Sequence, residues 1–451
     1  MPGSGVKRED IIYGLWRRLH GKGVGAVLAR GAGGSFSVKV LGAAIAFALQ
    51  ILLARLLGAS QYGVYIYALT WILVLSVICQ LGMNTSLLRF VAAYNAKNEW
   101  GLLRGILSRS MQYVFLASFV ISITASLIVW LNYEQIGRDQ SKTFWIAFIL
   151  LPLLSLTGLR SAGLCGLKHV VLAALPDSFF RPLLIAALAG LTYMYTQHNL
   201  QAMQVMFFNL VGVMTALIIS SIWLRKVLPK QIKHCKPVFS EREWLAVSFP
   251  LLFMAGMQLI LHQIDIIMIG IILDTEQAGI YAVASRITGL VIFGLSAANS
   301  IAAPMISELY STERHQALQR VVTLSARGVF VFTLLTSIGL SVFGEYFLRL
   351  FGEEFKMGYE PLLILLTGQV INAMSGSVGF LMVMTGHQNQ AAMILGVSGL
   401  INILMNVILI PEFGMIGAAI ATAVTTALWN ILMLIYVWRR MNINPTALAG
   451  I

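Results

Sequence analysis

The segment Arg55-Leu-Leu-Gly-Ala-Ser-Gln-Tyr-Gly-Val-Tyr65 ends one long apolar run, turns, and begins another. A second segment, Ile271-Ile-Leu-Asp-Thr-Glu-Gln-Ala-Gly-Ile-Tyr281, places Gly279 and Tyr281 where the first has Gly63 and Tyr65, at a constant offset of 216 residues. Each segment joins two apolar stretches of membrane-crossing length. The recurrence predicts a chain built from two related halves.

The composition is that of a membrane protein. Of the 451 residues, 58% are apolar and 11% are charged, which is too little polar surface to cover a soluble globule of this size. The net charge of +13 does not indicate nucleic-acid binding, because the basic residues lie between apolar runs rather than on one face. Cys79, Cys165 and Cys235 lack close spacing, so we expect no disulfide framework, no metal site and no cofactor. The sequence predicts an all-α polytopic membrane protein.

Twelve apolar stretches of about 20 residues, the length that crosses the hydrocarbon core, follow one another along the chain. They lie near 36–57, 63–85, 107–131, 143–165, 170–194, 202–224, 244–273, 279–303, 326–350, 361–384, 389–410 and 415–438. Six precede and six follow the basic stretch 225–243, which predicts an N-lobe at 36–224, a linker at 225–243 and a C-lobe at 244–438. With six helices in each lobe, the halves are parallel repeats.

The distribution of basic residues predicts the orientation in the membrane. The N-terminal segment, the even-numbered connections and the C-terminal tail hold 22 Lys and Arg residues, and the odd-numbered connections hold 5. By the positive-inside rule, both termini face the cytoplasm. The basic segment 1–35 has no cleavage pattern of a signal peptide and is expected on the cytoplasmic surface, as is the tail 439–451.

Polar residues within the spans are candidates for function, because each is costly in hydrocarbon. Gln258, His262 and Asp265 are spaced by four and three residues, so they share one helix face. That face suggests the wall of a wet cavity. His262 and Asp265 could exchange a coupling proton, or could form a hydrogen-bonded pair that fixes helix packing. Both interpretations stay open.

Basic residues within or beside the spans are candidate contacts for an anionic substrate, and they are Lys39, Arg55, Arg89, Arg160 and Arg181. Lys39 and Arg55 lie near the two ends of one span, where snorkelling to the interface is an alternative. Arg181 follows Asp177 by one helical turn, so the two could form an ion pair instead. Arg160 has no acidic residue near it in sequence and is the preferred phosphate contact.

Uncharged polar residues form stripes at helical spacing in the later spans. Gln369 and Asn372 lie three residues apart, and Asn402 and Asn406 lie four apart. With Gln258, these residues could line the cavity and bind sugar hydroxyls, or they could join helices by hydrogen bonds.

Four parts of the sequence carry a resemblance to a known family. They are Ile51 to Tyr65, Leu87-Leu-Arg-Phe-Val91, Gln263-Ile-Asp-Ile-Ile-Met-Ile-Gly270 with Ala278-Gly-Ile-Tyr281, and Ile410-Pro-Glu-Phe-Gly-Met-Ile-Gly-Ala-Ala-Ile-Ala-Thr422. In order and spacing they resemble the polysaccharide transporter family. That family holds the O-antigen and exopolysaccharide flippases of the multidrug/oligosaccharidyl-lipid/polysaccharide exporter superfamily. The resemblance covers residues 36–438.

The resemblance implies two six-helix lobes in a V around a central cavity. It implies a transporter, not an enzyme, that moves an undecaprenyl-pyrophosphate-linked oligosaccharide to the periplasmic leaflet of a bacterial cytoplasmic membrane. It further implies coupling to an ion gradient, membrane lipids as neighbours, and a polysaccharide polymerase and chain-length machinery as partners.

Two alternatives accompany this prediction. A drug/cation antiporter of the same superfamily would share the fold. An intramembrane glycan polymerase or ligase would share the composition, but such enzymes generally carry a sizeable external loop, whereas the connections here are short.

Overall fold

The computed structural model describes residues 24–448 apart from 197–198, 234, 313 and 442. Most of the basic segment 1–35 therefore lies outside the described residues, and so does the side chain of Lys39. Nearly all of the described chain is helical, and it contains no strand. The predicted all-α fold class is confirmed.

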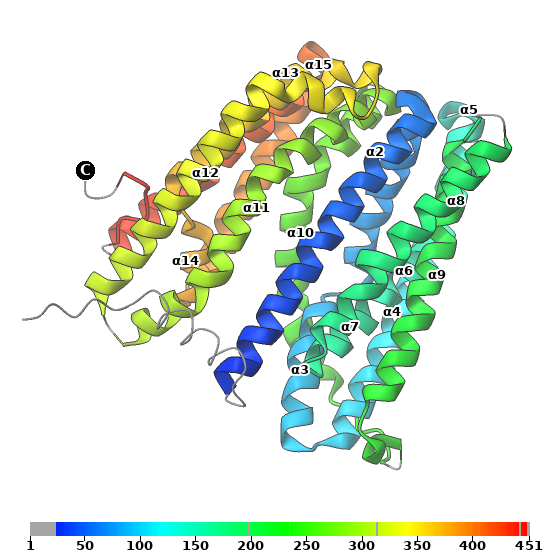
Figure 1. The fold of residues 1–451 in the computed structure, drawn as a ribbon. Helices are drawn as coiled ribbons and strands as arrows, with labels where there is room; N and C mark the ends of the chain where they lie inside the picture. Colours follow the sequence, from blue (N-terminus) through cyan, green and yellow to red (C-terminus); the bar gives the residue numbers. More distant parts are fainter. Residues whose placement is uncertain (1–23, 197–198, 234, 313, 442, 449–451) are drawn as a thin grey trace, which may run out of the picture.

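The helices fall into two groups (Figure 1). The first group holds α2 (Val24–Cys79), α3 (Met83–Lys97), α4 (Trp100–Leu131), α5 (Tyr133–Ile136), α6 (Arg138–Gly166), α7 (Val170–Leu175), the π-helical turn η1 (Pro176–Phe180), α8 (Arg181–Tyr195) and α9 (Ala202–Val227). After η2 (Lys230–Lys233), the second group holds α10 (Glu241–Ile272), α11 (Thr275–Ser311), α12 (His315–Arg349), η3 (Glu353–Gly358), α13 (Tyr359–Ser375), α14 (Val378–Met384) and α15 (Gln388–Met441).

The long helix α2 folds back on itself at the first recurring segment. Gly58 has φ 70° and ψ 172°, a conformation outside the helical region that glycine adopts without a Cβ clash. The Tyr62 hydroxyl donates a hydrogen bond of 3.0 Å to Gln50 Oε1. In a continuous helix, these twelve residues would span about 18 Å. The bond therefore requires a sharp reversal, which separates two arms at the predicted connector.

A second reversal lies in α15, at Gly414, with φ 59° and ψ −137°. Asn402 Nδ2 donates to Thr425 Oγ1 at 3.2 Å, although the two residues would lie about 35 Å apart along a continuous helix. The predicted spans 389–410 and 415–438 are thus two arms that lie side by side.

By length and composition, eight helices in the described part of the chain can cross a membrane, or nine if the bent pair α13 and α14 is one span. Two of these eight, α2 and α15, contain the reversals just described. The protein is a multi-pass membrane protein, and the number of twelve spans stays a prediction.

The two lobes meet at the end of the molecule where the recurring segments lie (Figure 1). Arg55 Nε donates to the Leu350 carbonyl at 2.6 Å, and the Ala59 amide donates to Glu354 Oε2 at 2.7 Å. A Cβ atom on Gly63 would overlap the Thr275 carbonyl, so the backbones of the two connectors are in direct contact. The two copies of the predicted sequence repeat therefore contact each other, and this contact joins the lobes.

Helix α10 crosses from one lobe to the other. Near its beginning, Trp244 Nε1 donates to the Tyr94 hydroxyl at 3.0 Å, and Ser248 Oγ lies 2.7 Å from Ser86 Oγ of α3. Its later half packs on α15 in the C-lobe, where Asp265 is buried. The start of α10 is therefore anchored to the N-lobe together with the end of the linker.

Candidate functional site

The C-lobe contains a buried carboxylate surrounded by neutral donors. Asp265 of α10 is 4% exposed. It accepts hydrogen bonds from the Tyr281 hydroxyl of α11 at 2.7 Å, and from Asn406 Nδ2 and Thr422 Oγ1 of α15 at 2.8 and 2.5 Å. The two α15 donors come from opposite arms of that helix, so the reversal at Gly414 brings them together.

A second layer of amides supports this carboxylate. Asn406 Nδ2 also donates to Asn402 Oδ1 at 3.1 Å, and Asn402 Nδ2 donates to Thr425. Asn406 Oδ1 is buried and has no hydrogen-bond partner. None of the ion pairs among the described residues includes Asp265. The cluster thus has one negative charge, one vacant acceptor and no cation, an arrangement suited to an exchangeable proton or a small cation with oxygen ligands.

His262 is not among the hydrogen-bond partners of this carboxylate. Its side chain is exposed, and the bonds to Asp265 come from Tyr281, Asn406 and Thr422 instead. Gln258, one turn earlier on α10, is also exposed. The helix face predicted for the three residues therefore joins two exposed side chains to one buried carboxylate, and a direct hydrogen bond between His262 and Asp265 is not among the contacts described.

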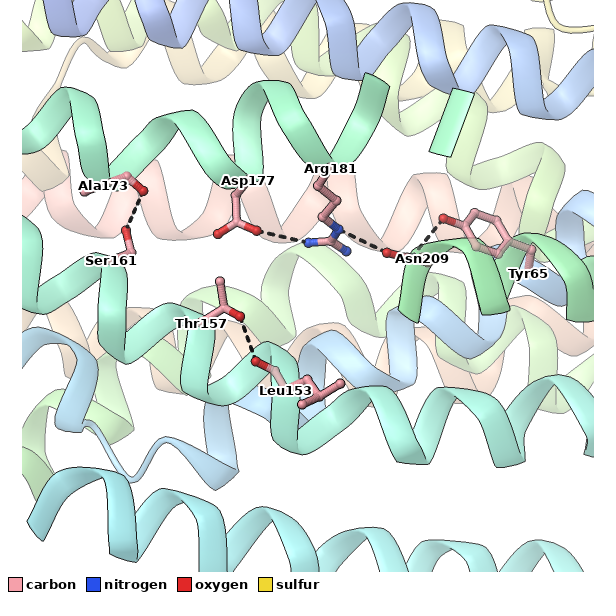
Figure 2. Close-up of polar contacts among 8 residues, drawn as sticks. All are labelled: Tyr65, Leu153, Thr157, Ser161, Ala173, Asp177, Arg181 and Asn209. Carbon is pink, nitrogen blue, oxygen red and sulfur yellow. Dashed lines mark hydrogen bonds and ion pairs between the residues drawn. The ribbon is translucent and has the colours of Figure 1, made fainter. Parts of the chain in front are cut away.

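The N-lobe has a polar network that, unlike the Asp265 cluster, contains both a cation and a carboxylate (Figure 2). Arg181 Nη1 lies 3.6 Å from Asp177 Oδ1, so the ion pair considered from the sequence is formed. Arg181 Nε donates to Asn209 Oδ1 at 3.0 Å, and Asn209 Nδ2 donates to the Tyr65 hydroxyl at 3.2 Å. Asp177 belongs to η1, and the insertion of a π-helical turn is a common feature of functional sites in helices.

The internal repeat extends to the side chains of both networks. Tyr65 and Tyr281 are 216 residues apart, and each hydroxyl joins the polar network of its own lobe. Asn209 and Thr425 are separated by the same 216 residues, and both lie on the last arm of their lobe. The sequence analysis did not single out these four positions as site residues. Tyr65 and Tyr281 end the recurring segments, and applying the same offset beyond those segments pairs Asn209 with Thr425.

Arg160 of α6 has no counter-charge. Its Nε atom is buried without a hydrogen-bond partner, and the ion pairs of the described residues do not include it. The charged group that acts on it electrostatically is another cation, Arg225 of α9. The neighbouring hydroxyls of Thr157 and Ser161 bond to the Leu153 and Ala173 carbonyls (Figure 2). A partly buried guanidinium beside a second cation favours an anionic ligand.

The other candidate residues are scattered. Arg55 is exposed and belongs to the contact between the lobes, and Arg89 is exposed on α3. Asn372 Nδ2 donates to Gln369 Oε1 at 3.1 Å within α13, apart from the Asp265 cluster. The structure therefore joins Asp265, Asn402 and Asn406 in one hydrogen-bonded cluster and pairs Gln369 with Asn372 in another place.

A family model described as "Polysaccharide biosynthesis protein" matches residues 28–310, well over half of the chain. The chain belongs to this family. The model of a second family, MatE, matches residues 250–408 of the C-lobe. The two matched regions overlap across α10 and α11, the helices that carry Asp265 and Tyr281.

One relative supports this assignment. This polysaccharide biosynthesis protein is 28% identical over 169 residues to the "Probable low-salt glycan biosynthesis flippase Agl15" of Haloferax volcanii. The match covers 37% of the chain and 36% of that relative, so it spans about a third of the relative's length.

Solved structures share the fold. The inward-facing conformation of a multidrug resistance MATE family transporter of the MOP superfamily has a TM-score of 0.71 at 13% identity, over 91% of this chain and 97% of that one. The lipid II flippase MurJ in an inward closed conformation has a TM-score of 0.65 at 14% identity, over 90% and 87% of the two chains. The polysaccharide biosynthesis protein thus has the fold of this transporter superfamily.

Proposed function

We propose that the protein is a flippase that moves a lipid-linked oligosaccharide across a membrane by alternating access, with coupling to an ion gradient. The observation that carries this proposal is the placement of two uncompensated charges in different lobes. Arg160 is an unpaired cation in the N-lobe, and Asp265 is a carboxylate with only neutral partners in the C-lobe. One charge suits a phosphate and the other a coupling cation.

The chemistry of the substrate explains why such a protein is needed. A sugar linked through pyrophosphate to a polyprenol cannot carry its polar part through hydrocarbon, whereas its lipid tail stays in the bilayer. The protein therefore has to shelter the polar part and open to one side at a time. The family match and the flippase relative support this class of substrate.

The finer assignment follows the sequence analysis. We infer that the carrier is undecaprenyl pyrophosphate in a bacterial cytoplasmic membrane, that both termini are cytoplasmic, and that the product enters O-antigen or exopolysaccharide synthesis. A polymerase with its chain-length machinery would then act on the product. Archaeal relatives such as Agl15 make the carrier lipid the first detail to test.

The contacts of the first recurring segment with the C-lobe supply the gate. By the orientation that the charge count predicts, they close the outer end of the protein. Opening to the outside requires the hydrogen bonds from Arg55 to Leu350 and from Ala59 to Glu354 to break. The Ala59 amide is at the start of a helical arm, where a carboxylate is favoured by the helix dipole. Glu354 is therefore a latch between the lobes.

The leading experiment measures the substrate's position directly. In cells that lack the protein and every redundant flippase, the lipid-linked sugar should stay protected from a membrane-impermeant probe at the outer face, and the wild-type protein should restore labelling. Unchanged labelling without the protein would refute the proposal. Restoration by the wild type but not by Arg160→Ala would support the anion contact.

Removal of the latch should shift the lobes. With the native cysteines replaced, spin labels at Arg138 and Glu412, which are both exposed, report the distance between the outer ends of the lobes. Glu354→Ala should increase the population at long distance. Glu353→Ala is the matched control, because Glu353 pairs with Lys356 in its own loop and its side chain is 71% exposed. Equal distributions in both variants would rule out the latch.

A drug/cation antiporter is the second candidate, favoured by the MatE match over residues 250–408 and by the buried carboxylate in that region. Efflux of cationic dyes from cells that express the protein would support it. Absence of efflux together with restored labelling of the lipid-linked sugar would exclude it.

A further inference from the structure

The chain that follows α15 docks back into the C-lobe. Helix α15 ends at Met441, and the tail segment, residues 443–447, continues outside the helix. Its alternate residues Ile443, Pro445 and Ala447 are buried, whereas the two between them are partly exposed. Figure 1 shows the segment in red, next to α12. The tail segment is therefore packed against the lobe along its length.

Side chains of α12 bind the backbone of the tail segment. Gln319 Oε1 accepts a hydrogen bond from the Asn444 amide at 2.9 Å, and Gln319 Nε2 donates to the Asn444 carbonyl at 2.6 Å. Arg327 Nε donates to the Ala447 carbonyl at 3.2 Å. The eight residues from Gln319 to Arg327 rise by about 12 Å along α12. These bonds to two backbone sites fix one register of docking.

The break between α13 and α14 forms the other wall of this docking site. Helix α13 ends at Ser375, α14 begins at Val378, and the two are bent by 44°. Gly376 between them has φ 74° and ψ −170°, which glycine adopts without a Cβ clash. A Cβ atom on Gly376 would overlap the Pro445 carbonyl, so the backbone of the tail segment packs directly on the break.

The tail segment occupies a carbonyl that a continuous helix would need. In an unbroken α-helix, the Val378 amide would donate to the Met374 carbonyl four residues earlier. Here the Ala447 amide donates to Met374 at 3.1 Å, and the Val378 amide donates to the Gly376 carbonyl at 2.9 Å. Gly376 can also adopt helical angles. Departure of the tail segment therefore frees Met374 for the bond that would join the two helices.

The N-lobe holds its own last connection in a similar way, but without a break. Arg104 of α4 donates to the Cys235 carbonyl at 2.7 Å, and the Val238 amide donates to the Gly101 carbonyl at 2.9 Å. Helices α4 and α12 contain the third predicted span of each lobe. The fourth span of the N-lobe is the single helix α6, whereas the fourth of the C-lobe is α13 and α14. Only the C-lobe, among the described residues, combines the docked segment with a broken helix.

We propose that the tail segment is a releasable strap that sets the shape of this span. Docked, it keeps α13 and α14 apart at Gly376; undocked, it lets Val378 bond to Met374 and joins the helices. Removal of the 44° bend would move the far end of α14 by about 8 Å. By the charge count, that end is cytoplasmic. The strap thus regulates the cytoplasmic opening, a role that rests on the proposed flippase function.

A distance measurement tests the strap. With the native cysteines replaced, spin labels at Leu324 of α12 and Val383 of α14, which are 75% and 39% exposed, report the separation of the helices on either side of the tail segment. In nanodiscs, a variant that lacks residues 443–451 should shift the main distance by about 5 Å or more. A synthetic peptide of residues 441–451 should restore the original distance. An unchanged distance in the shortened variant would overturn the proposal.

A pair of substitutions tests the docking in the full chain. Gln319→Ala removes both bonds to Asn444 and should shift the distance in the same direction as the shortened variant. Thr323→Val is the matched control, because Gln319 Nε2 also donates to the Thr323 hydroxyl at 2.9 Å and this variant removes that bond alone. Equal shifts in the two variants would show that the bonds to the tail are not what holds the bend.

A proline tests the competition for the Met374 carbonyl. Val378→Pro removes the amide that a continuous helix would need, at the first position of α14, where proline is tolerated. In the variant that lacks residues 443–451, this substitution should return the distance to that of the wild type. A shift that persists with proline at this position would mean that the helices do not join, which contradicts the proposal.

These measurements use no substrate, so they are separable from the proposed function. In cells, leaflet labelling by the shortened variant should slow by about threefold or more, with Thr323→Val at the wild-type rate. A distance shift with an unchanged labelling rate would remove the regulatory role and leave the flippase. A distance shift together with labelling that does not require the protein would keep the strap and remove the flippase.

Discussion

The polar networks of the two lobes contain equivalent tyrosines but differ in charge balance. In the N-lobe, Tyr65 leads through Asn209 to Arg181, whose charge is met by Asp177. In the C-lobe, the hydroxyl of Tyr281 donates directly to Asp265, and no ion pair of the described residues includes that carboxylate. One network contains its own counter-ion, and the other lacks one.

This difference assigns separate tasks to the lobes. In the N-lobe network the charge of Arg181 is balanced by Asp177, so this network needs no exchanged ion to be neutral. A buried carboxylate held by neutral donors gains a partner only by taking up a proton or a cation. The N-lobe also presents Arg160, whose Nε atom is buried without a hydrogen-bond partner and which belongs to none of the ion pairs of the described residues. We therefore expect anion recognition in the first lobe and ion coupling in the second.

The largest predicted effect is that of Asp265→Asn. If one coupled cation crosses with each turnover, a potential of 100 mV supplies about 2.3 kcal/mol, or roughly 50-fold in the transport ratio. The variant should lose this gradient-dependent component in proteoliposomes assayed by leaflet protection. Separate sodium and proton gradients would identify the ion.

The N-lobe gives the matched control for that experiment. Asp177→Asn also removes one intramembrane carboxylate, but Arg181 keeps its bond to Asn209. It should therefore preserve the response to the gradient. Loss of the response in Asp177→Asn, with retention in Asp265→Asn, would reverse the assignment of the two lobes.

The next prediction compares substitutions of two arginines in the same lobe. Arg160→Gln removes an unpaired charge, so transport should fall about tenfold while thermal stability stays equal or rises. Arg181→Gln leaves Asp177 without its ion pair, so the free energy of unfolding should fall by roughly 1–3 kcal/mol. Thermal unfolding in detergent and leaflet protection measure the two quantities. Equal profiles for the two variants would show that both arginines have one role.

Much of the fold could be predicted because it depends on patterns that are local in sequence. Apolar composition and length predicted the all-α, membrane-spanning class, and the recurring Gly-x-Tyr at 63–65 and 279–281 located two equivalent connectors. Both positions take part in the contact between the lobes, where Gly63 lies against the backbone near Thr275. The crossing of α10 from one lobe to the other was not predictable, because it depends on contacts of Trp244 and Ser248 with distant residues.

The site was predictable only in part for the same reason. Helical spacing grouped Asp265 with His262, although the actual partners of Asp265 come from α11 and from both arms of α15. The stripe of Asn402 and Asn406 was visible in the sequence, but its proximity to α10 was not. Periodicity identifies residues that share a helix face, whereas a buried charge selects partners by distance in three dimensions.

The smallest predicted effect compares the two tyrosines that begin the networks. Tyr281→Phe removes a donor to a charged carboxylate, a bond worth about 1.5–3 kcal/mol, and Tyr65→Phe removes the acceptor of a neutral amide, worth about 0.5–1.5 kcal/mol. The two substitutions delete the same atom at positions related by the repeat. The difference between their effects on stability therefore depends only on the residues around each hydroxyl.

Thermal unfolding should therefore show a greater loss for Tyr281→Phe than for Tyr65→Phe. The ion dependence should separate the pair further, because Tyr281 touches the proposed coupling carboxylate and Tyr65 does not. A shift in the ion concentration for half-maximal transport is expected for Tyr281→Phe only. Equal stability losses and equal ion dependence would mean that the repeat has kept the two networks alike in function, and coupling would then have to involve both lobes.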